Sequence, residues 1–467
     1  MKKSLRIIIT LALTTISNFV SSQWAHQNVN YLSNFDDSNV AAEPIYGIRY
    51  QGCWGWRNTN DGREYGIIGS TSGTYFVEVT NPTNPIERDY VTGRSNNRIW
   101  HEYKSYQNYL YIISDGGGNS LQIVDMSYLP DSVHVVYDSD AIFDSGHTLY
   151  VDGNLLYVAY VSKLGMATSS MSVYSLANTE LPVLLRRLDQ DYPFINSVHD
   201  MYVVNDTIFA SCGYEGLYVF KYNVAANSFN QLGSLTSYPD AGYNHSSFLD
   251  ASHQVLYMCD EVPDGMAVKV VDVTDISNMI VVDTFYSHPG ATPHNPYVLR
   301  NELFISYYQD GVVAYNLDDP RHPVNNGYFD THYQNSPGTY NYPPYQGCWG
   351  AYTDLPSEHL LASDMQLGLF VLDISQVMST GPIIEVKPAI TMYPNPAYER
   401  LHINLHCSSY PREIKVIDAT GRVMLSSEMK AQETIFDIIT STFTSGLYQV
   451  TIKGNEGVSI YKFIAAN

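Results

Sequence analysis

Charged side chains are scarce in this chain, and basic side chains are the scarcest. Lys and Arg number 25 against 47 Asp and Glu among 467 residues, which gives a formal net charge of −22. Nucleic-acid-binding proteins neutralise phosphates with clustered Lys and Arg. The charge therefore argues against nucleic acid as a partner, whereas an acidic surface suits solubility outside the cell and the binding of cations.

Long apolar runs are missing beyond the N-terminus, so the sequence predicts no membrane-spanning helix. At the N-terminus itself, three basic residues precede the short apolar stretch 7–16, and small residues follow at 20–23. This order is typical of a secretory signal peptide. We expect cleavage after Ser22, so that residues 1–22 are removed and the mature protein is exported.

Cysteine is rare, with five residues in the chain: Cys53, Cys212, Cys259, Cys348 and Cys407. Cys53 and Cys348 lie in matching "QGCWG" strings. Cys212 follows His199 by 13 residues, and Cys259 follows His245 by 14 residues. Disulfides are permitted in an exported protein. The bridges to expect are Cys53–Cys348 and Cys212–Cys259, and buried free thiols are an equally weighted alternative.

What the chain has in abundance is tyrosine, with 40 residues, in a sequence that also favours β-branched side chains. This composition favours strands over helices. Histidines recur 46, 52, 46 and 49 residues apart, each at the start of a similar segment: His101, His147, His199, His245 and His294. A period of this length with several short strands in each unit is typical of a β-propeller.

Each histidine-led unit contains four short apolar strands divided by Asn, Asp, Gly and Pro turns. Two further units begin with the related strings at 52–58 and 347–354, where "CWG" takes the place of histidine. We therefore predict an all-β fold with a seven-bladed β-propeller over residues 23–376. The last unit lacks a clear fourth strand, and we expect the N-terminal segment 28–37 to supply it and close the ring.

The repeat stops near Ser375, and a different pattern follows. Residues 377–390 are a proline-containing linker, and residues 391–467 hold alternating apolar strands with glycine turns. This pattern predicts a small C-terminal β-sandwich.

The repeating unit resembles a known family. The strings "LQIVD" (121–125), "VKVVDVTD" (268–275) and "GLFVLDIS" (368–375), with "VTNPTNP" (79–85), resemble the LVIVD repeat. Together with the order of the histidine strings, they resemble the choice-of-anchor B family of exported bacterial proteins over about residues 28–376. The resemblance implies a β-propeller on a secreted protein and carries no assigned reaction.

The C-terminal strings "YPNPA" (393–397), "DATGRV" (418–423) and "SGLYQVTI" (445–452) resemble the C-terminal sorting domain of type IX secretion cargo. This resemblance implies that the type IX secretion machinery is a partner. It also implies passage across the outer membrane, followed by release or attachment to the cell surface. A carbohydrate-binding sandwich is the alternative.

In a propeller the first strand of each blade lines the central channel, and the second strand returns to the same face. The residues expected at this channel mouth as ligand-binding are His101, His147, His199, His245, His294, Trp54 and Trp349. Carboxylates that end second strands would surround them: Asp115, Glu215, Asp260, Glu261, Asp310 and Asp364. Glu102 and Asp200 directly follow histidines, and we expect them to face away because neighbouring strand residues alternate.

Imidazoles and carboxylates together can bind a divalent metal or carry out acid–base chemistry. The metal ligands to expect are His199, His245, His294, Asp260 and Asp310. The alternative is that each histidine hydrogen-bonds to the backbone of the neighbouring blade. The sequence contains no His-Glu-x-x-His or Gly-x-Ser-x-Gly string, and no catalytic residue is assigned.

The leading hypothesis is a secreted or cell-surface binding module that takes a glycan or protein ligand at this mouth. A metal-dependent hydrolase or lyase that uses the same residues is the alternative.

Overall fold

The computed structural model describes residues 24–94, 99–115, 121–332, 342, 344–378, 390–393, 396–405, 412–418, 421–429, 435–454 and 457–466. Within these residues the chain forms strands and two single-turn 3-10 helices, η1 (Leu188–Gln190) and η2 (Ile276–Asn278). The predicted all-β class is therefore confirmed. The signal peptide predicted for residues 1–22, residues 379–389 of the linker predicted for 377–390, and Cys407 lie outside the described residues.

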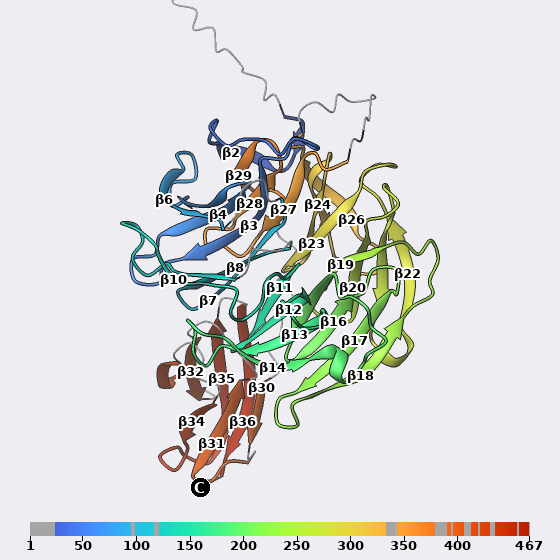
Figure 1. Ribbon diagram of the computed structural model, residues 1–467. Helices are drawn as coiled ribbons and strands as arrows, with labels where there is room; N and C mark the ends of the chain where they lie inside the picture. Colours follow the sequence, from blue (N-terminus) through green and yellow to red (C-terminus); the bar gives the residue numbers. More distant parts are fainter. Residues whose placement is uncertain are drawn as a thin grey trace, which may run out of the picture.

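Seven sheets follow one another in the described part of residues 24–378 (Figure 1). The first contains β3 (Tyr50–Arg57), β4 (Glu64–Ser70), β5 (Gly73–Glu78) and β6 (Ile86–Thr92), and the second β7 (His101–Tyr106), β8 (Tyr109–Ser114), β9 (Gln122–Asp125) and β10 (His134–Asp138). The third contains β11 (Leu149–Asp152), β12 (Leu155–Val161), β13 (Ser169–Ser175) and β14 (Val183–Arg187), and the fourth β15 (Asp200–Val204), β16 (Thr207–Ser211), β17 (Leu217–Asn223) and β18 (Ser228–Leu235). The fifth contains β19 (Asn244–Leu249), β20 (Val255–Asp260), β21 (Val268–Asp272) and β22 (Ile280–Phe285). The sixth contains β23 (Pro293–Leu299), β24 (Glu302–Tyr307), β25 (Gly311–Asn316) and β26 (Val324–Phe329), and the seventh β27 (Cys348–Tyr352), β28 (His359–Asp364) and β29 (Gly368–Asp373).

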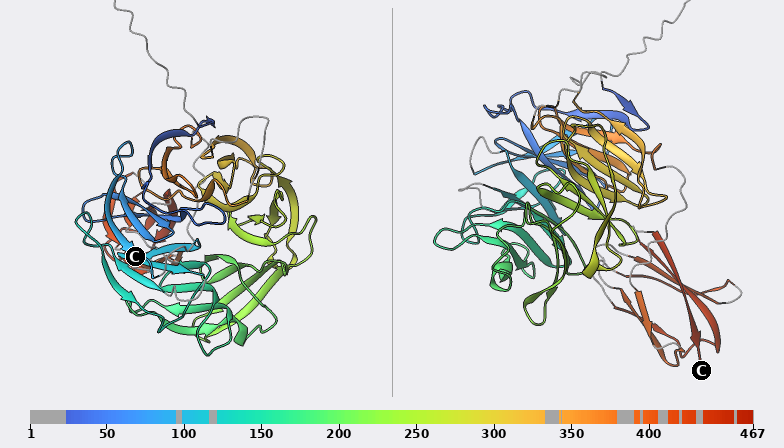
Figure 2. Two further views of the ribbon diagram at one scale, coloured as in Figure 1. Left: turned by 45° about the horizontal axis from the view of Figure 1, so that its top comes forward. Right: turned by 90° about the vertical axis from the view of Figure 1, so that its right-hand side faces the viewer.

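The first strands of these sheets contact one another in sequence, from β3 through β7, β11, β15, β19 and β23 to β27, and β27 in turn contacts β3. Figure 2 shows the resulting arrangement of sheets around a central axis. β2 (Asn30–Phe35) pairs antiparallel with β29 of the seventh sheet. β1 (His26–Gln27) adds a fifth strand beside β26, which the sequence pattern did not indicate.

Apolar runs in the second strands explain why these sheets pack face to face. β4, β20 and β24 are buried at every position. One core cluster joins Ile67 and Phe76 of the first sheet to Leu110 and Val124 of the second. Because each sheet is covered on both faces, its middle strands carry continuous rather than alternating hydrophobicity.

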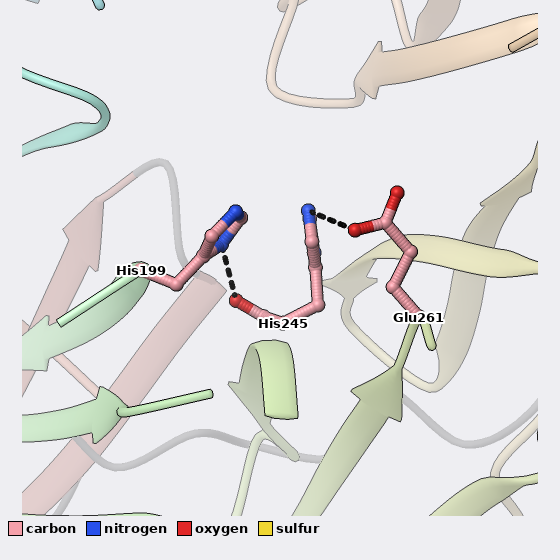
Figure 3. A group of neighbouring side chains, drawn as sticks. All are labelled: His199, His245 and Glu261. Atoms are coloured by element: carbon pink, nitrogen blue, oxygen red, sulfur yellow. Dashed lines mark hydrogen bonds and ion pairs between the residues drawn. The ribbon is translucent and has the colours of Figure 1, made fainter. Parts of the chain in front are cut away.

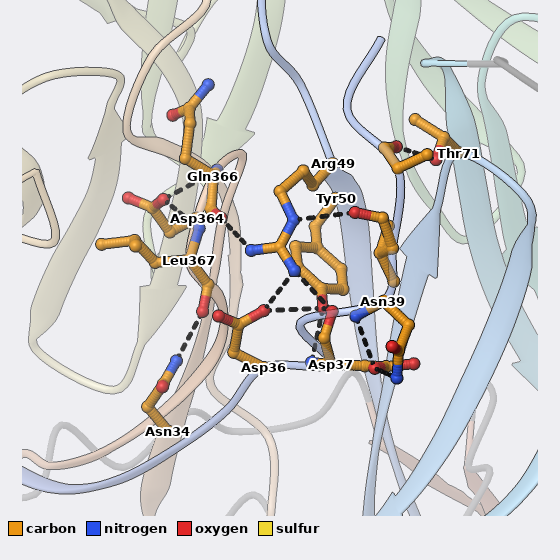
Figure 4. Close-up of polar contacts among 12 residues, drawn as sticks. Asn34, Asp36, Asp37, Asn39, Arg49, Tyr50, Thr71, Asp364, Gln366 and Leu367 are labelled. Atoms are coloured by element: carbon orange, nitrogen blue, oxygen red, sulfur yellow. Dashed lines mark hydrogen bonds and ion pairs between the residues drawn. The ribbon is translucent and has the colours of Figure 1, made fainter.

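Arg49 ties the N-terminal segment to the last sheet (Figure 4). Its guanidinium donates to the carbonyls of Val40 (3.1 Å), Gln366 (2.9 Å) and Asp37, and it pairs with Asp36 at 2.9 Å. Five donors in a fixed planar fork suit this set of acceptors, which a flexible ammonium group could not reach together. This side chain therefore links residues that are more than 300 positions apart in the sequence.

The two "QGCWG" strings use their first glycines differently. Gly347 has a φ of +96°, and a Cβ there would lie 2.0 Å from the Tyr308 carbonyl oxygen. At Gly52 a Cβ would lie 2.5 Å from the His101 carbonyl oxygen. Both positions require glycine, one for its left-handed conformation and both for close approach to a neighbouring strand.

The C-terminal part contains two sheets around a shared core. One sheet is formed by β30 (Ile390–Tyr393), β31 (Arg400–Leu405) and β34 (Ile435–Ile439), and the other by β33 (Val423–Met429), β32 (Arg412–Asp418), β35 (Gly446–Gly454) and β36 (Gly457–Ala465). Leu401 and Ile403 of the first sheet pack against Val416, Val450 and Phe463 of the second. Two sheets that bury their facing sides in this way form a sandwich.

Candidate functional site

Six aromatic rings form an arc at one end of the ring of first strands. In order along the arc they are His147, His199, His245, His294, Trp349 and Trp100. The centroids of successive imidazoles lie 4.2 Å apart, the step from His294 to Trp349 is 4.6 Å, and the step to Trp100 is 5.0 Å. Each ring lies at or just before the start of the first strand of a different sheet, so the repeat brings these side chains together.

A repeated backbone irregularity aims these side chains. In β19 the register slips between Asn244 and Ser246, which leaves His245 as the extra residue, and the same slip occurs around His294 in β23 and Trp349 in β27. A β-bulge of this kind re-aims one side chain without ending the strand.

The two remaining histidines of the arc lie at similar points. Ser211 pairs with Asp200, and its carbonyl oxygen also accepts the N–H of His199. Two consecutive residues therefore lie opposite Ser211. The His147 N–H donates to Ala159 O, while the Ala159 N–H donates to the carbonyl of the next residue, Thr148. The extra residue therefore recurs in five of the seven sheets, and histidine or tryptophan occupies it in each of the five.

One nitrogen of the ring holds several of these histidines in place. Nδ1 of His199 donates to His245 O at 3.1 Å, and Nδ1 of His294 donates to Trp349 O at 2.6 Å. Nδ1 of His147 lies 2.8 Å from Asp115 Oδ2. The backbone bonds are those expected if the histidines join neighbouring sheets. They use one nitrogen only, so Nε2 is left for other partners.

The arc borders a cavity of about 460 Å³. Besides the six rings, its described lining includes Tyr243, Tyr308 and Tyr345 near the histidines, and the charged residues Asp115, Glu261, Glu102, Lys104 and Asp200. Trp349 Nε1 donates to Glu102 Oε1 at 3.3 Å, which connects the arc to the charged residues. The cavity thus combines aromatic faces with more carboxylates than ammonium groups, as small-ligand sites often combine apolar walls with a few polar groups.

Burial controls the charges of these imidazoles. It lowers the pKa of His199 and of His245 well below the usual value, with neighbouring imidazoles adding to the effect, and it lowers the pKa of His294 to about 3. Burial acts in the same direction on His147, but the hydrogen bond and charge of Asp115 outweigh it and raise the pKa of that imidazole. Three neighbouring imidazoles are therefore neutral at pH 7, and a neutral imidazole has a lone pair to offer.

The pKa values of the carboxylates in the cavity shift upward. Burial raises the pKa values of Glu261, Glu102 and Asp200. A hydrogen bond from Tyr308 counteracts this rise at Glu261, and the charge of Lys104 counteracts it at Glu102 and Asp200. Burial also lowers the pKa of Lys104. Both effects follow from the cost of holding a charge away from water.

His199, His245 and Glu261 bring three potential ligand atoms within 4.8 Å of one another (Figure 3). His245 Nε2 lies 3.9 Å from Glu261 Oε2, and the Tyr308 hydroxyl donates to the other oxygen of Glu261 at 2.7 Å. Two imidazoles and one carboxylate are a ligand set used for zinc and other divalent transition metals.

His101 does not join the arc, contrary to expectation. β7 pairs with β8 in continuous register from His101 opposite Ser114 to Tyr106 opposite Tyr109. Without a bulge, the side chain of His101 points to the other face, where its Nδ1 lies 2.6 Å from Gln51 Oε1. Trp100, one residue earlier, borders the cavity instead.

Trp54 also lies outside the described lining, whereas Trp349 is part of it. The Trp54 indole donates to Ser105 Oγ at 2.9 Å, and Lys104 Nζ lies 4.3 Å from the centre of the ring. Trp54 lies in the middle of β3 rather than at its start, and it therefore helps to hold a cavity residue without bordering the cavity itself.

Asp260 and Asp310, predicted as metal ligands, have other partners. Asp260 forms a fully buried ion pair with Lys269 at 2.8 Å and accepts a hydrogen bond from Tyr238. Asp310 pairs with His288 at 2.9 Å. Consecutive residues at a strand end point in different directions, and Glu261, the residue after Asp260, is the one that enters the cavity.

Glu102 and Asp200 line the cavity, although alternation predicted that they would face away. In β7 the alternation itself holds, but it places Trp100, Glu102 and Lys104 on the cavity face and His101 on the other. At Asp200 the bulge at His199 allows two consecutive side chains to reach the cavity.

The predicted disulfides are absent from the described residues, where Cys53, Cys212, Cys259 and Cys348 are free thiols. Cys53 and Cys348 each donate to Gly350 O, at 3.7 and 3.5 Å, so the two thiols share an acceptor instead of a bond. Cys212 and Cys259 belong to separate core clusters. Their equivalent positions in the repeat do not bring them together.

The comparisons with known proteins bear mainly on the C-terminal part. No curated protein matches this sequence. Among solved structures, a putative 6-phosphogluconolactonase from Bacteroides fragilis is similar, with 11% identity, a TM-score of 0.49, and coverage of 82% of this chain and 100% of that one. The computationally designed Ika8 protein is similar with 9% identity, a TM-score of 0.43, and coverage of 69% of this chain and 82% of that one.

Residues 391–466 match the secretion system C-terminal sorting domain. This match confirms the predicted type IX signal and gives the chain its connection to that secretion machinery. Among the described residues, the structure contains no helix that is both long and apolar enough to span a membrane. The chain therefore ends in a type IX sorting domain, and its place of action is outside the cell or at the cell surface.

Proposed function

We propose that this protein is a cell-surface or secreted binding module that takes its ligand in the cavity beside the histidine arc. In this proposal residues 23–376 are a seven-bladed β-propeller of the choice-of-anchor B type, closed by the N-terminal strand. Residues 377–390 are a linker, and residues 391–467 deliver the propeller across the outer membrane. The propeller would then carry the binding function of the exported protein.

The observation that carries the proposal is the lining of the cavity. The six aromatic rings of the arc and six tyrosines border a space of about 460 Å³, which is the size of a site for a small molecule. Aromatic faces of this kind stack on sugar rings and on apolar side chains. Buried Trp and Tyr that have no ligand would more often pack tightly against each other than border a cavity.

The charges of the lining favour one class of ligand over another. Asp115, Glu261, Glu102 and Asp200 face the cavity together with a single lysine, Lys104. A phosphate or carboxylate ligand would meet repulsion there. We therefore expect an uncharged glycan or a peptide with a basic group, for which carboxylates are hydrogen-bond acceptors.

A glycan and peptide array probed with the mature protein tests the proposal. The matched variants are Trp100→Leu, which removes a ring from the cavity border, and Trp24→Leu, which removes an indole outside the lining. Binding that falls more than about tenfold in the first variant and stays near the wild-type level in the second supports the proposal. Equal binding by both variants, or no binding by the folded wild-type protein, contradicts it.

A further inference from the structure

We propose that His199, His245 and Glu261 form a binding site for a divalent transition-metal ion at the mouth of the cavity. The inference rests on the proposed function, since the ion would lie in the same cavity and would form part of its ligand site. It differs from the expectation drawn from the sequence, because Glu261 takes the place of Asp260 and Asp310 and because His294 is not among the ligands.

The donor set is the first argument. The three ligand atoms lie within 4.8 Å of one another, and they come from three separate segments that the sheets hold in place (Figure 3). In a tetrahedral site with bonds of about 2.1 Å, donors lie about 3.4 Å apart. The 3.9 Å between His245 Nε2 and Glu261 Oε2 is close to this spacing, so small side-chain rotations are enough to enclose an ion.

The groups behind these ligands are the second argument. His245 O accepts the Nδ1–H of His199, which leaves Nε2 of His199 as the atom with the lone pair. The Tyr308 hydroxyl holds one oxygen of Glu261 and leaves the other directed at His245. Partners that fix the tautomer of a histidine and the orientation of a carboxylate are typical of metal sites.

A purely structural role for the histidines accounts for only part of this arrangement. Bonds between neighbouring sheets use Nδ1 of His199 and of His294. They give no reason for Nε2 of His245 to lie 3.9 Å from Glu261 Oε2.

His147 and His294 border the site and have different roles. His147 Nε2 lies 2.7 Å from His199 Nε2, so an ion bound by His199 takes the place of that hydrogen bond. The ring of His294 is tilted by 44° against that of His245, with centroids 4.2 Å apart, but His294 is outside the group of three ligands. His294 is therefore a control residue from the same arc.

The experiment uses the mature protein, stripped with a chelator and then titrated with Zn²⁺ by calorimetry and with Co²⁺ by visible absorption. The wild-type protein should bind one ion per chain, and Co²⁺ should show the absorption of a site with nitrogen ligands. His245→Gln and Glu261→Gln should each weaken binding by more than about tenfold. His294→Gln should bind within about threefold of wild type, and circular dichroism should show that all variants are folded.

Two results would overturn the inference. One is the absence of stoichiometric Zn²⁺ and Co²⁺ binding by the folded wild-type protein, and the other is unchanged binding in both ligand variants. The array distinguishes this failure from failure of the proposed function. If Trp100→Leu loses array binding and the protein binds no metal, the proposed binding module stands and the metal site is rejected. If the protein binds metal and no array ligand, the metal site stands and the proposed binding module is rejected.

Discussion

The Nε2 atoms of His147 and His199 lie 2.7 Å apart, across the boundary between two sheets. Since His199 donates its Nδ1–H to the carbonyl of His245, its Nε2 accepts, and His147 is the donor. Asp115, on the far side of His147, balances the charge of that donor. The arc therefore begins with an imidazole that a carboxylate holds, and it continues with imidazoles whose pKa values burial lowers.

Replacing Asp115 with Asn should weaken this chain of bonds. The amide has no charge to balance the His147 imidazolium, and a hydrogen bond to a charged group stabilises a fold by about 1–3 kcal/mol. We expect urea unfolding at pH 6 to show a loss of about that size. The matched change Asp140→Asn, at an exposed carboxylate, should alter the free energy of unfolding by less than about 0.5 kcal/mol. Equal effects of the two changes would contradict this account of the pair.

The stability of the fold should fall even when Arg49 is replaced conservatively. Arg49→Lys keeps the charge but loses the planar fork that reaches Val40, Gln366 and Asp37. We expect a loss of about 2 kcal/mol in the free energy of unfolding, because three partly buried acceptors lose their donors together.

Arg300→Lys is the control for that change. Arg300 pairs with Glu358 at the surface, where both side chains are nearly half exposed. Pairs of this kind contribute about 0–1 kcal/mol, so this variant should unfold like wild type in the same urea titration. If Arg300→Lys lowers the free energy of unfolding as much as Arg49→Lys does, the hydrogen bonds of Arg49 contribute no specific stability.

The four described cysteines should remain thiols in the mature protein. Burial raises the pKa of Cys53 to about 12 and raises those of Cys212, Cys259 and Cys348. Thiolates are the reactive form, so iodoacetamide should leave these residues unmodified in the folded protein and alkylate them in denaturant. Peptide mapping that finds Cys53 linked to Cys348, or Cys212 linked to Cys259, would contradict the structure.

Asp330 should make stability depend on pH. Burial, with the charges of Asp310 and Asp364 nearby, raises its pKa to about 8 from an ordinary value near 4. The folded state then holds a proton between about pH 4 and pH 8 that the unfolded state has lost, so stability falls as the pH rises through this range.

Asp330→Asn removes the titrating carboxyl group and should therefore remove the loss of stability that accompanies rising pH. The amide oxygen can still accept the His332 N–H, which now donates to Asp330 at 2.8 Å. We expect a melting temperature several degrees above wild type at pH 8.5, consistent with about 1–3 kcal/mol, and a much smaller difference at pH 4.5. A constant difference across that range would show that Asp330 titrates normally.

Sequence patterns were sufficient for the fold class and for the place where side chains gather. The spacing of the histidines predicted that His147, His199, His245 and His294 would come together, because equivalent positions of repeating sheets face a common axis. The strings in residues 391–467 predicted the sorting domain, and the comparison confirms it.

The detailed site could not be predicted, because it depends on single-residue shifts of register. His101 occupies the same position in the repeat as the other histidines, yet β7 has no bulge beside it and its side chain faces Gln51. Whether Asp260 or Glu261 faces the cavity depends on the same kind of shift. Five "x-His-x" strings of similar composition do not show which of their strands contain an extra residue.

A crystal structure of the mature protein soaked in Zn²⁺, with anomalous data at the zinc edge, tests the central claim most directly. The account predicts one strong anomalous peak per chain, about 2.1 Å from Nε2 of His199, Nε2 of His245 and a carboxylate oxygen of Glu261. It also predicts that the imidazoles keep Nε2 toward the cavity. Absence of a peak at these three residues, or imidazoles whose Nε2 atoms bond only to neighbouring sheets, would contradict it.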